Sequence, residues 1–290
     1  MKQNKSLHRP SPGYLVFRTF NALFMVTLTL VIMIPILKIV IDSFDEKASE
    51  TVFRIIPETF TLDAYKLIIS RPAMFRPLMI SFITTVSGTL VAMTVTSLYA
   101  YGLAQKNLPG RKFLLGIALV TMVFRAGMIP LFLVVRNLGL MNSLLAVILV
   151  HAMDAYYLLL LKNFFEGIPV SIFDAAEIDG CTPMQTFIRV VLPLSKPGLA
   201  AIGLFYTVFY WNQFFDYILY IQTKPHLHNF QVFLRSLVIE TDTQGFEGFS
   251  FATQSLKNAA ITVSIIPVLI LYPFVQGYFV KGINLGAVKG

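Results

Sequence analysis

The sequence predicts an all-α membrane protein with six transmembrane helices, on the strength of its composition, its long apolar runs and the placement of its charges. The chain has 290 residues, of which 56% are hydrophobic and 13% are charged. A soluble domain is about 45–50% apolar and about 25% charged. A core of this size cannot bury so much apolar surface, so lipid is the expected solvent for the excess.

Six apolar runs have the length of a bilayer-crossing helix, which takes about 17–25 residues. They are continuous, unlike the alternating pattern of barrel strands, and therefore predict helices. The first run is too long for a signal peptide and lacks a small-residue cleavage site, so we expect it to be a retained helix. It follows an N-terminal segment, residues 1–18. The predicted spans cover residues 19–37, 78–105, 113–135, 140–161, 199–221 and 258–280.

The charges predict that both chain ends lie in the cytoplasm. In this orientation the cytoplasmic segments carry the whole formal net charge of +8, and the charges of the outer segments cancel. Such an excess of Lys and Arg on the inner side is the positive-inside pattern. We therefore predict one transmembrane domain, 19–290, with outer loops at 42–77 and 222–257 and a cytoplasmic loop at 162–198. The first outer loop is long enough to hold a small structured element.

Several function classes find no support in the sequence. The cations do not form a basic patch for nucleic acid, and the single cysteine, Cys181, excludes an intrachain disulfide. We find no HExxH motif, no Ser/His/Asp grouping and no phosphate-binding GxxxxGK[ST] loop. The chain is therefore expected to be no enzyme, and to bind no metal and no cofactor of its own. A secondary transporter, an alternative, would predict paired hydropathy repeats, which are not apparent.

The cytoplasmic loop predicts two short helices joined at a glycine. Residues 172–178 favour a helix, and Asp179-Gly180 supplies a stop with glycine suited to a left-handed backbone. Thr182 and Pro183 then form an N-cap and a first helical position. A hairpin that only joins two spans is an equal alternative on these grounds. The second helix is expected to present an apolar face made by Phe187, Val190 and Val191 and to end at Pro193 and Pro197.

This loop resembles the coupling loop of ABC importer permeases over residues 174–198. Its first part has the family's EAA triplet as Asp174-Ala175-Ala176 and the central Asp-Gly as Asp179-Gly180. Its last part has Phe187, Val190, Leu192-Pro193 and Pro197 at the family's spacing. Asp174 replaces the usual Glu, Cys181 the usual Ala, and Val190 the usual Ile.

The resemblance implies the fold of a type I ABC importer permease in a bacterial plasma (inner) membrane. It also implies a heterodimer with a second permease, and docking of the loop on one of two ATPase subunits, which would hold the ATP and Mg²⁺.

Two further segments resemble the carbohydrate importers of the maltose class, and in particular their smaller, six-span permease. They are Tyr210-Trp211-Asn212-Gln213-Phe214 and the C-terminal end, residues 279–290. The resemblance implies an oligosaccharide or polysaccharide fragment as cargo, delivered by an extracellular solute-binding protein. Import of another solute, such as a peptide or an amino acid, is the alternative.

Polar residues inside the spans are candidates for the substrate pathway, because such residues are costly in lipid and normally face a wet cavity or the bundle interior. Trp211, Asn212, Gln213 and Asp216 combine aromatic, amide and carboxylate groups that suit a sugar. Hydrogen bonding between helices is the alternative. Arg125 either pairs with Asp154 or meets an acidic sugar in the pathway. His151 lies one turn from Asp154, and we interpret it as an interior side chain whose hydrogen bonds are satisfied.

Overall fold

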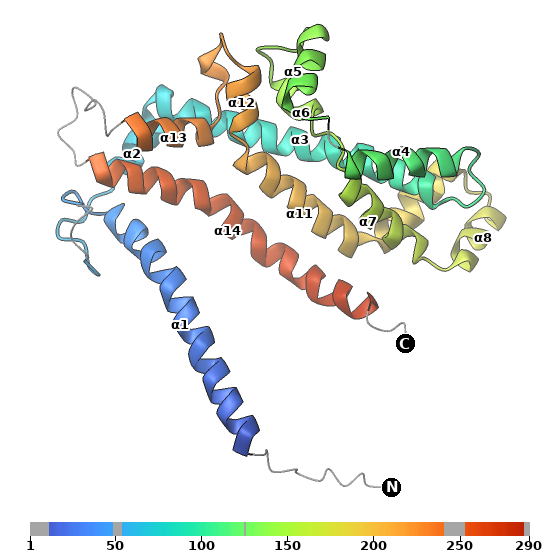
Figure 1. Ribbon diagram of the computed structural model, residues 1–290, viewed down its shortest axis with the longest axis horizontal. Helices are drawn as coiled ribbons and strands as arrows, with labels where there is room; N and C mark the ends of the chain where they lie inside the picture. The colour runs from blue at the N-terminus through green and yellow to red at the C-terminus, as the bar shows by residue number, and fades with distance from the viewer. Residues whose placement is uncertain (1–11, 49–53, 125, 241–252, 287–290) are drawn as a thin grey trace. The chain divides into compact units, whose positions relative to one another are not determined.

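The computed structural model describes residues 12–48, 54–124, 126–240 and 253–286 (Figure 1). Within these ranges the chain is helical, and its only extended pairing is an isolated bridge between Asp45 and Phe60. The helices are α1 (Pro12–Asp42), α2 (Asp63–Ser70), α3 (Pro72–Ala104), α4 (Arg111–Val123), α5 (Met128–Asn137), α6 (Leu144–Leu149), α7 (Ala155–Glu166), α8 (Val170–Ile178), α9 (Pro183–Thr186), the π-helical η1 (Phe187–Val191), α10 (Leu192–Leu194), α11 (Lys196–Asn212), α12 (Phe215–Tyr220), the 3₁₀ turn η2 (Pro225–Leu227), α13 (Phe230–Glu240) and α14 (Thr253–Gly286).

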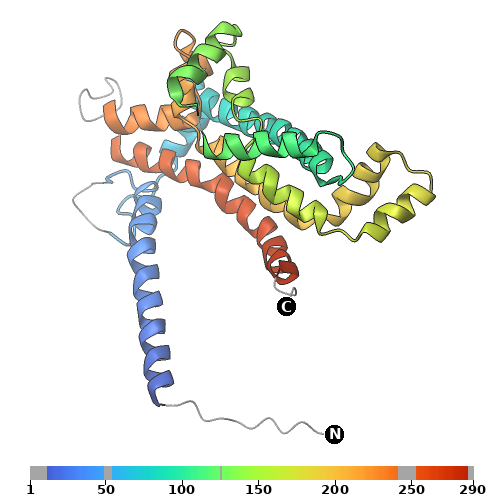
Figure 2. The same ribbon diagram turned by 45° about the vertical axis from the view of Figure 1, so that its right-hand side comes forward.

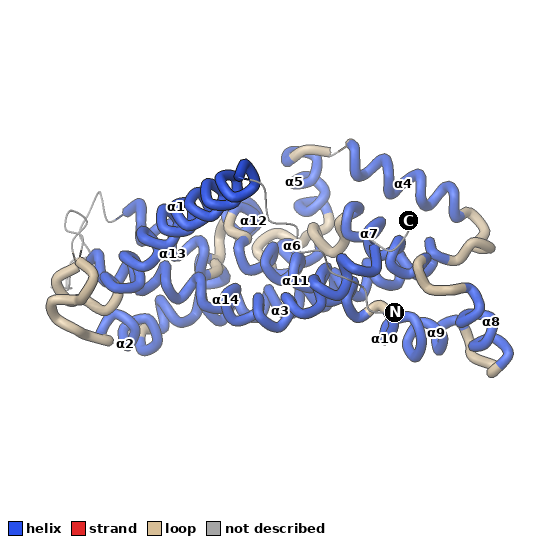
Figure 3. The backbone as a smooth tube through the Cα atoms, turned by 90° about the horizontal axis from the view of Figure 1, so that it is seen from below, coloured by secondary structure: helices blue, strands red, loops and turns tan. Residues whose placement is uncertain are grey.

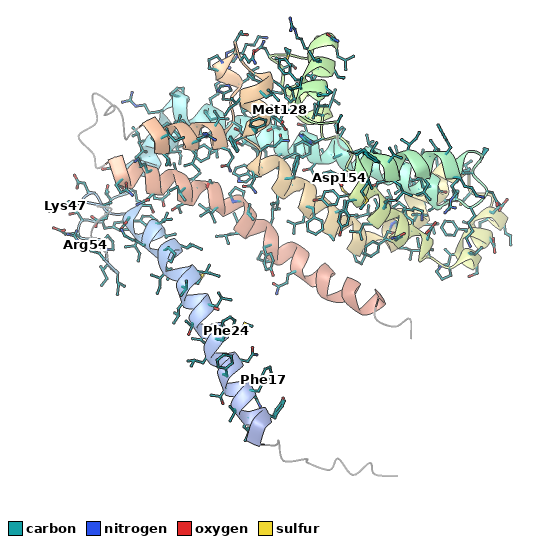
Figure 4. All side chains as sticks on the ribbon, viewed as in Figure 1. Phe17, Phe24, Lys47, Arg54, Met128 and Asp154 are labelled. Atoms are coloured by element: carbon teal, nitrogen blue, oxygen red, sulfur yellow. The ribbon has the colours of Figure 1, made fainter. Side chains whose placement is uncertain are left out.

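The chain divides into two compact units. The first comprises Met1–Lys66 and Phe246–Thr262, and the second comprises Leu67–Gly245 and Val263–Gly290. In the first unit α1 exposes apolar side chains along its length, among them Phe17 and Phe24 (Figure 4). A helix that is apolar all round and unburied suits a lipid or protein partner within the membrane.

A small cluster of charged side chains follows α1, in the first predicted outer loop. The carboxylate of Asp45 is almost fully buried and accepts hydrogen bonds from the backbone N–H groups of Lys47, Glu58 and Thr59 at 3.0–3.2 Å. Arg54 pairs with Asp45 and Glu58 (Figure 4). Burial raises the pKa of Asp45, but the three N–H donors and Arg54 outweigh it, so the pKa lies below its ordinary value.

The second unit is built around α3, which packs most extensively on α11 and α7 (Figure 2). At one point the helices approach closely, because Gly88 of α3 leaves room for the ring of Tyr210 on α11. Small residues permit such close packing between membrane helices. The Tyr210 hydroxyl donates to the carbonyl of Ile148 at 2.9 Å, and the hydroxyls of Thr96 and Tyr206 lie 2.8 Å apart. The buried tyrosines thus keep their polar ends satisfied.

Three described helices are long and apolar enough to cross a membrane: Gly13–Asp42, Pro72–Ala104 and Gln254–Pro273. Counting each of two bent helix pairs as one span raises the number to five. The all-helical fold class is therefore confirmed, whereas the count of six spans stays a prediction.

The predicted spans at 113–135, 140–161 and 199–221 are each divided in the structure, and expecting them as continuous helices was wrong. The first becomes α4 and α5, the second α6 and α7, and the third α11 and α12 (Figure 3). Local backbone explains the breaks. Gly127, which precedes α5, has φ +79°, and Gln213, which follows α11, is extended at φ −64° and ψ 131°. Irregular backbone at membrane depth is tolerated where protein or a wet cavity surrounds it.

Candidate functional site

Residues 170–194, from α8 through α10, form a helical hairpin at one end of the second unit (Figure 3). Gly180 at its corner has φ +77°, as the sequence predicted, and the predicted N-cap at Thr182 is confirmed. The Thr182 hydroxyl accepts from the Gln185 N–H, and the Gln185 side chain accepts from the Thr182 N–H, which completes a capping box. The corner is therefore fixed by its own residues.

The inner side of the hairpin is anchored in the unit's hydrophobic core. Phe187 and Val191 are buried there with Phe165 and Leu103. The Phe187 ring lies 4.9 Å from that of Tyr101, whose hydroxyl donates to the Pro183 carbonyl at 3.0 Å. The apolar face was predicted from Phe187, Val190 and Val191, and expecting it to be exposed was wrong, because Phe187 and Val191 point inward and Val190 is half-buried. These side chains hold the hairpin to α3.

The expectation that Pro193 ends the second helix was wrong, because the chain stays helical to Leu194. Residues 187–191 form a π-helical turn, in which the Leu192 N–H donates to the Phe187 carbonyl five residues earlier. The wider turn accommodates Pro193, which has no N–H and would crowd the carbonyl of an α-helical turn. Pro193 and Pro197 instead lie in the first turns of α10 and α11.

The outer side of the hairpin carries large apolar side chains that are mostly exposed in the described chain. Ile178 is 86% exposed, and Met184 and Ile188 are more than half exposed. The motif analysis missed these three positions, since it followed the family pattern. Their signal was the occurrence of large apolar residues beside the exposed Asp179–Gly180 corner. Asp174, Ala175 and Asp179 are exposed on the same hairpin, whereas Ala176 is buried.

An ionic network fixes the chain where it enters the hairpin. Glu166, at the end of α7, accepts from Arg111 and from Lys162, each at 2.7 Å. The Arg111 Nε also donates to the Leu103 carbonyl at the end of α3, at 2.7 Å. Arg111 therefore joins the end of α3, the start of α4 and the end of α7.

Trp211 faces α14, where its indole N–H donates to the Ser264 carbonyl at 2.8 Å. The side chain is 4% exposed and borders an apolar pocket of about 440 Å³ between α3, α11 and α14. This geometry matches the packing alternative for Trp211. The exposed amide of Asn212, in contrast, bonds within its own helix, from Nδ2 to the Val208 carbonyl at 2.9 Å.

A row of aromatic and polar side chains occupies the opposite face of α11. Phe205, Phe209 and Asn212 follow at helical spacing, i, i+4 and i+7. The ring of Tyr157 from α7 stacks on Phe205 at 5.5 Å, and the ring of His151 lies edge-on to Phe209 at 4.7 Å. Phe209 is 39% exposed and Asn212 is exposed. We call these five side chains, together with Asp216, the α11 row.

Asp216 ends the α11 row just beyond the break between α11 and α12. Its Oδ2 lies 2.6 Å from His151 Nε2 and accepts from Gln213 Nε2 at 2.8 Å. The reading of His151 as a satisfied side chain is therefore confirmed, but its partner, 65 residues away, was not foreseen. Gln213 is buried, and within the described ranges its Oε1 has no hydrogen-bond partner. The Asn229 amide donates to the Gln213 backbone carbonyl and holds the break in place.

The proposed pairing of Arg125 with Asp154 stays a prediction, because Arg125 lies outside the described residues. Asp154 is the N-cap of α7, and its carboxylate accepts from the backbone N–H groups of Tyr156 and Tyr157 (Figure 4). Its own N–H donates to the Tyr206 hydroxyl at 3.0 Å. Asp154 therefore has a local structural role whatever Arg125 does. Among the described residues, no group of His, Cys, Asp and Glu could hold a metal ion.

Long apolar helices, broken spans and a protruding hairpin define a membrane permease. No model of a protein family matches the chain. It is 43% identical over 275 residues to the polygalacturonan/rhamnogalacturonan transport system permease protein YtcP of Bacillus subtilis (strain 168), covering 92% of this chain and 96% of that protein. Protein LplC of the same organism is 38% identical over the full length of both chains. The chain belongs to the family of carbohydrate ABC-transporter permeases.

A solved structure agrees with this assignment. One chain in the crystal structure of a bacterial ABC transporter involved in the import of the acidic polysaccharide alginate superposes with a TM-score of 0.86. The two sequences are 30% identical, and the match covers 93% of this chain and 98% of the other. The resemblance drawn from the 174–198 segment is thereby confirmed at the level of family and fold.

Proposed function

We propose that this chain forms half of the membrane pathway of an ATP-driven importer for an oligosaccharide or polysaccharide fragment. The other half is a second, different permease. Two cytoplasmic ATPase subunits hold the ATP and Mg²⁺, and this chain hydrolyses no ATP and binds no cofactor. An extracellular solute-binding protein delivers the sugar. The complex lies in the bacterial plasma (inner) membrane, with both ends of this chain in the cytoplasm.

One observation carries the proposal: the hairpin is rigid at its corner, anchored on its inner side and apolar on its outer side. Ile178, Met184 and Ile188 present the kind of surface that a groove on a partner protein covers. Movement of an ATPase subunit would shift the hairpin as a body, because Gly180 and the capping box fix its shape. The coupling residues of the sequence motif then divide by role. Phe187 and Leu192 pack on the core and hold the hairpin, while Asp174, Ala175, Asp179 and the exposed Pro193 face the partner.

The α11 row supplies the sugar-contacting surface in this proposal. Sugar rings offer C–H faces that pack on the rings of Phe209 and Tyr157, and hydroxyls that bond to Asn212 and Asp216. Gln213 supports Asp216, and Trp211 supports the helix from its other side. The chain breaks beside Gln213, and broken helices at substrate sites are a recurrent device of transporters.

The native Cys181 makes docking testable without an added probe. It follows Gly180 directly, is partly exposed, and is the only cysteine of the chain. We expect a membrane-impermeant maleimide to label Cys181 in inside-out vesicles, and the ATPase subunits to protect it. Copurification in mild detergent should retain both ATPase subunits and the second permease, with ATP hydrolysis stimulated by sugar and binding protein.

Two variants sharpen the test. Ile178→Asp should abolish both protection and stimulated hydrolysis, because it puts a charge into the apolar contact. Ile55→Asp is the matched control, since Ile55 is also highly exposed but lies in an outer loop. Labelling of Cys181 from the outer side, or protection that survives Ile178→Asp, would overturn the proposed docking.

A further inference from the structure

The hydrogen-bonded pair of His151 and Asp216 lies at the end of the α11 row. The pair joins two breaks in the helical backbone, since His151 lies between α6 and α7 and Asp216 begins α12. The His151 side chain is 32% exposed and that of Asp216 is 15% exposed. The pair lies beside the partly exposed ring of Phe209 and is itself partly exposed, so an occupant of the proposed pathway can reach it.

Asp216 alone would oppose an acidic sugar. Two like charges about 7 Å apart repel by about 2 kcal/mol at an effective dielectric constant of about 20, which corresponds to more than tenfold in binding. Within the described ranges, His151 is the only ionisable side chain that hydrogen-bonds to Asp216, because its other partner, Gln213, is neutral. The guanidinium of Arg235 lies instead over the ring of Phe214, 5.1 Å from its centroid. Whether an acidic sugar is tolerated in the row therefore depends on the imidazole.

We infer that His151 is a specificity residue, whose positive charge neutralises Asp216 and so allows uronic-acid oligosaccharides to pass it. This inference rests on the proposed function. When the His151 imidazole is protonated, its charge cancels that of the Asp216 carboxylate, whose Oδ2 lies 2.6 Å from His151 Nε2. The charge of His151 alters only the net charge of the pair, so the passage of neutral sugars does not depend on it.

The alternative role of His151 is purely structural, as a hydrogen-bond link between the two breaks. His151→Gln separates the roles, because an amide can still donate to Asp216 but cannot carry its counter-charge. The double variant H151Q/D216N removes both charges and retains a hydrogen-bonding pair. A structural role predicts that the double variant is no better than the single one, whereas a charge role predicts rescue.

The experiment measures initial uptake into proteoliposomes that contain the complete transporter and its binding protein. The probes are trigalacturonate and its fully methyl-esterified, neutral form, and each variant is normalised to the native complex for each probe. We expect H151Q to lower trigalacturonate uptake at least about tenfold, to leave uptake of the ester within about twofold, and H151Q/D216N to restore trigalacturonate. His226→Gln, at an exposed histidine away from the row, should change neither probe.

Equal loss of both probes in H151Q, or unchanged uptake of both, overturns the inference and leaves the proposed function standing. Failure of H151Q/D216N to restore trigalacturonate overturns it as well. If the assembled native complex imports the neutral ester but excludes trigalacturonate, the inference alone is overturned. If it imports no oligosaccharide of any charge while remaining assembled with its ATPases, the proposed function itself fails.

Discussion

Gly180 is the position where a single side chain tests the role of the hairpin. Its φ of +77° lies in the left-handed region, and a Cβ added there would meet nothing within 4 Å. Any effect of substitution therefore arises from the backbone and not from a clash. For an L-residue the left-handed conformation costs roughly 1–2 kcal/mol, more for a β-branched residue and less for Asn.

Because 1.4 kcal/mol is a factor of ten in an equilibrium constant, Gly180→Val should reduce the population of correctly shaped hairpins by roughly tenfold or more. Gly180→Asn should reduce it only a few-fold. We expect sugar uptake and sugar-stimulated ATP hydrolysis in proteoliposomes to follow the order Gly, Asn, Val. The ATPase subunits should keep their intrinsic activity, since no variant touches their nucleotide site.

Gly139→Val is the matched control, because Gly139 has φ +70°, an equally open environment and a place outside the hairpin. Native uptake in Gly180→Val would refute the role assigned to the corner. An equal defect in Gly180→Asn and Gly180→Val would refute the backbone argument in particular. It would show instead that the partner surface tolerates no side chain at this position.

Three further predictions concern packing, coupling and the outer loop. Gly88→Ala places a methyl group 2.6 Å from the Tyr210 ring, so it should destabilise the detergent-solubilised protein by about 1–3 kcal/mol and lower its thermal midpoint. Arg111→Ala should lower the amount of sugar imported per ATP hydrolysed, because Glu166, which lies where the chain enters the hairpin, loses its link to α3 and α4. Asp45 has a lowered pKa, so its stabilisation of the loop is present above the unfolded value of 3.8 and is lost as pH falls below it. The hydrogen-exchange protection factors of amides in this loop, which are corrected for the intrinsic pH dependence of exchange, should therefore fall in acid, and Asp45→Asn should flatten that dependence.

Each of these has its own control and its own contrary result. Gly116→Ala meets nothing within 4 Å and should leave the midpoint unchanged, so equal melting of the Gly88 and Gly116 variants would contradict the packing argument. Lys112→Ala removes an exposed neighbouring cation, and an equal change in coupling would assign the effect to local charge. For the loop, protection factors that are equal in acid and at neutral pH would contradict the part given to Asp45.

Local signals made the hairpin predictable from sequence. The glycine corner, the Thr182 cap and the first helix depend on residues within one or two turns of each other, and each formed as expected. The π-helical turn at 187–191 was missed, because its wider winding follows from burying Phe187 and Val191 together while Pro193 comes next. Propensity alone gives no hint of that requirement.

The α11 row was harder to predict, because its contacts join residues far apart in the chain. Hydropathy found the apolar runs but not their breaks, since the broken segments are as apolar as continuous ones. The His151–Asp216 pair spans 65 residues, and no spacing rule connects them. Helical periodicity could have shown that Trp211 and Phe209 lie about 200° apart on one helix. It could not show which of the two faces meets α14.

The hairpin is connected to the α11 row through the helix α11 itself. A single residue, Ser195, separates the second limb of the hairpin from α11, and the two helical segments meet at 84°. From there α11 runs unbroken for 17 residues, about 25 Å, to Asn212. Near its start Gly198 lies against the Phe164 ring of α7, so close that an added Cβ would come within 2.7 Å. A displaced hairpin must therefore carry α7 and α11 together, and these helices bear Tyr157, Phe205 and Phe209. In the proposed function, a motion that an ATPase subunit applies at Ile178 would therefore reach the rings of the α11 row through these packed helices.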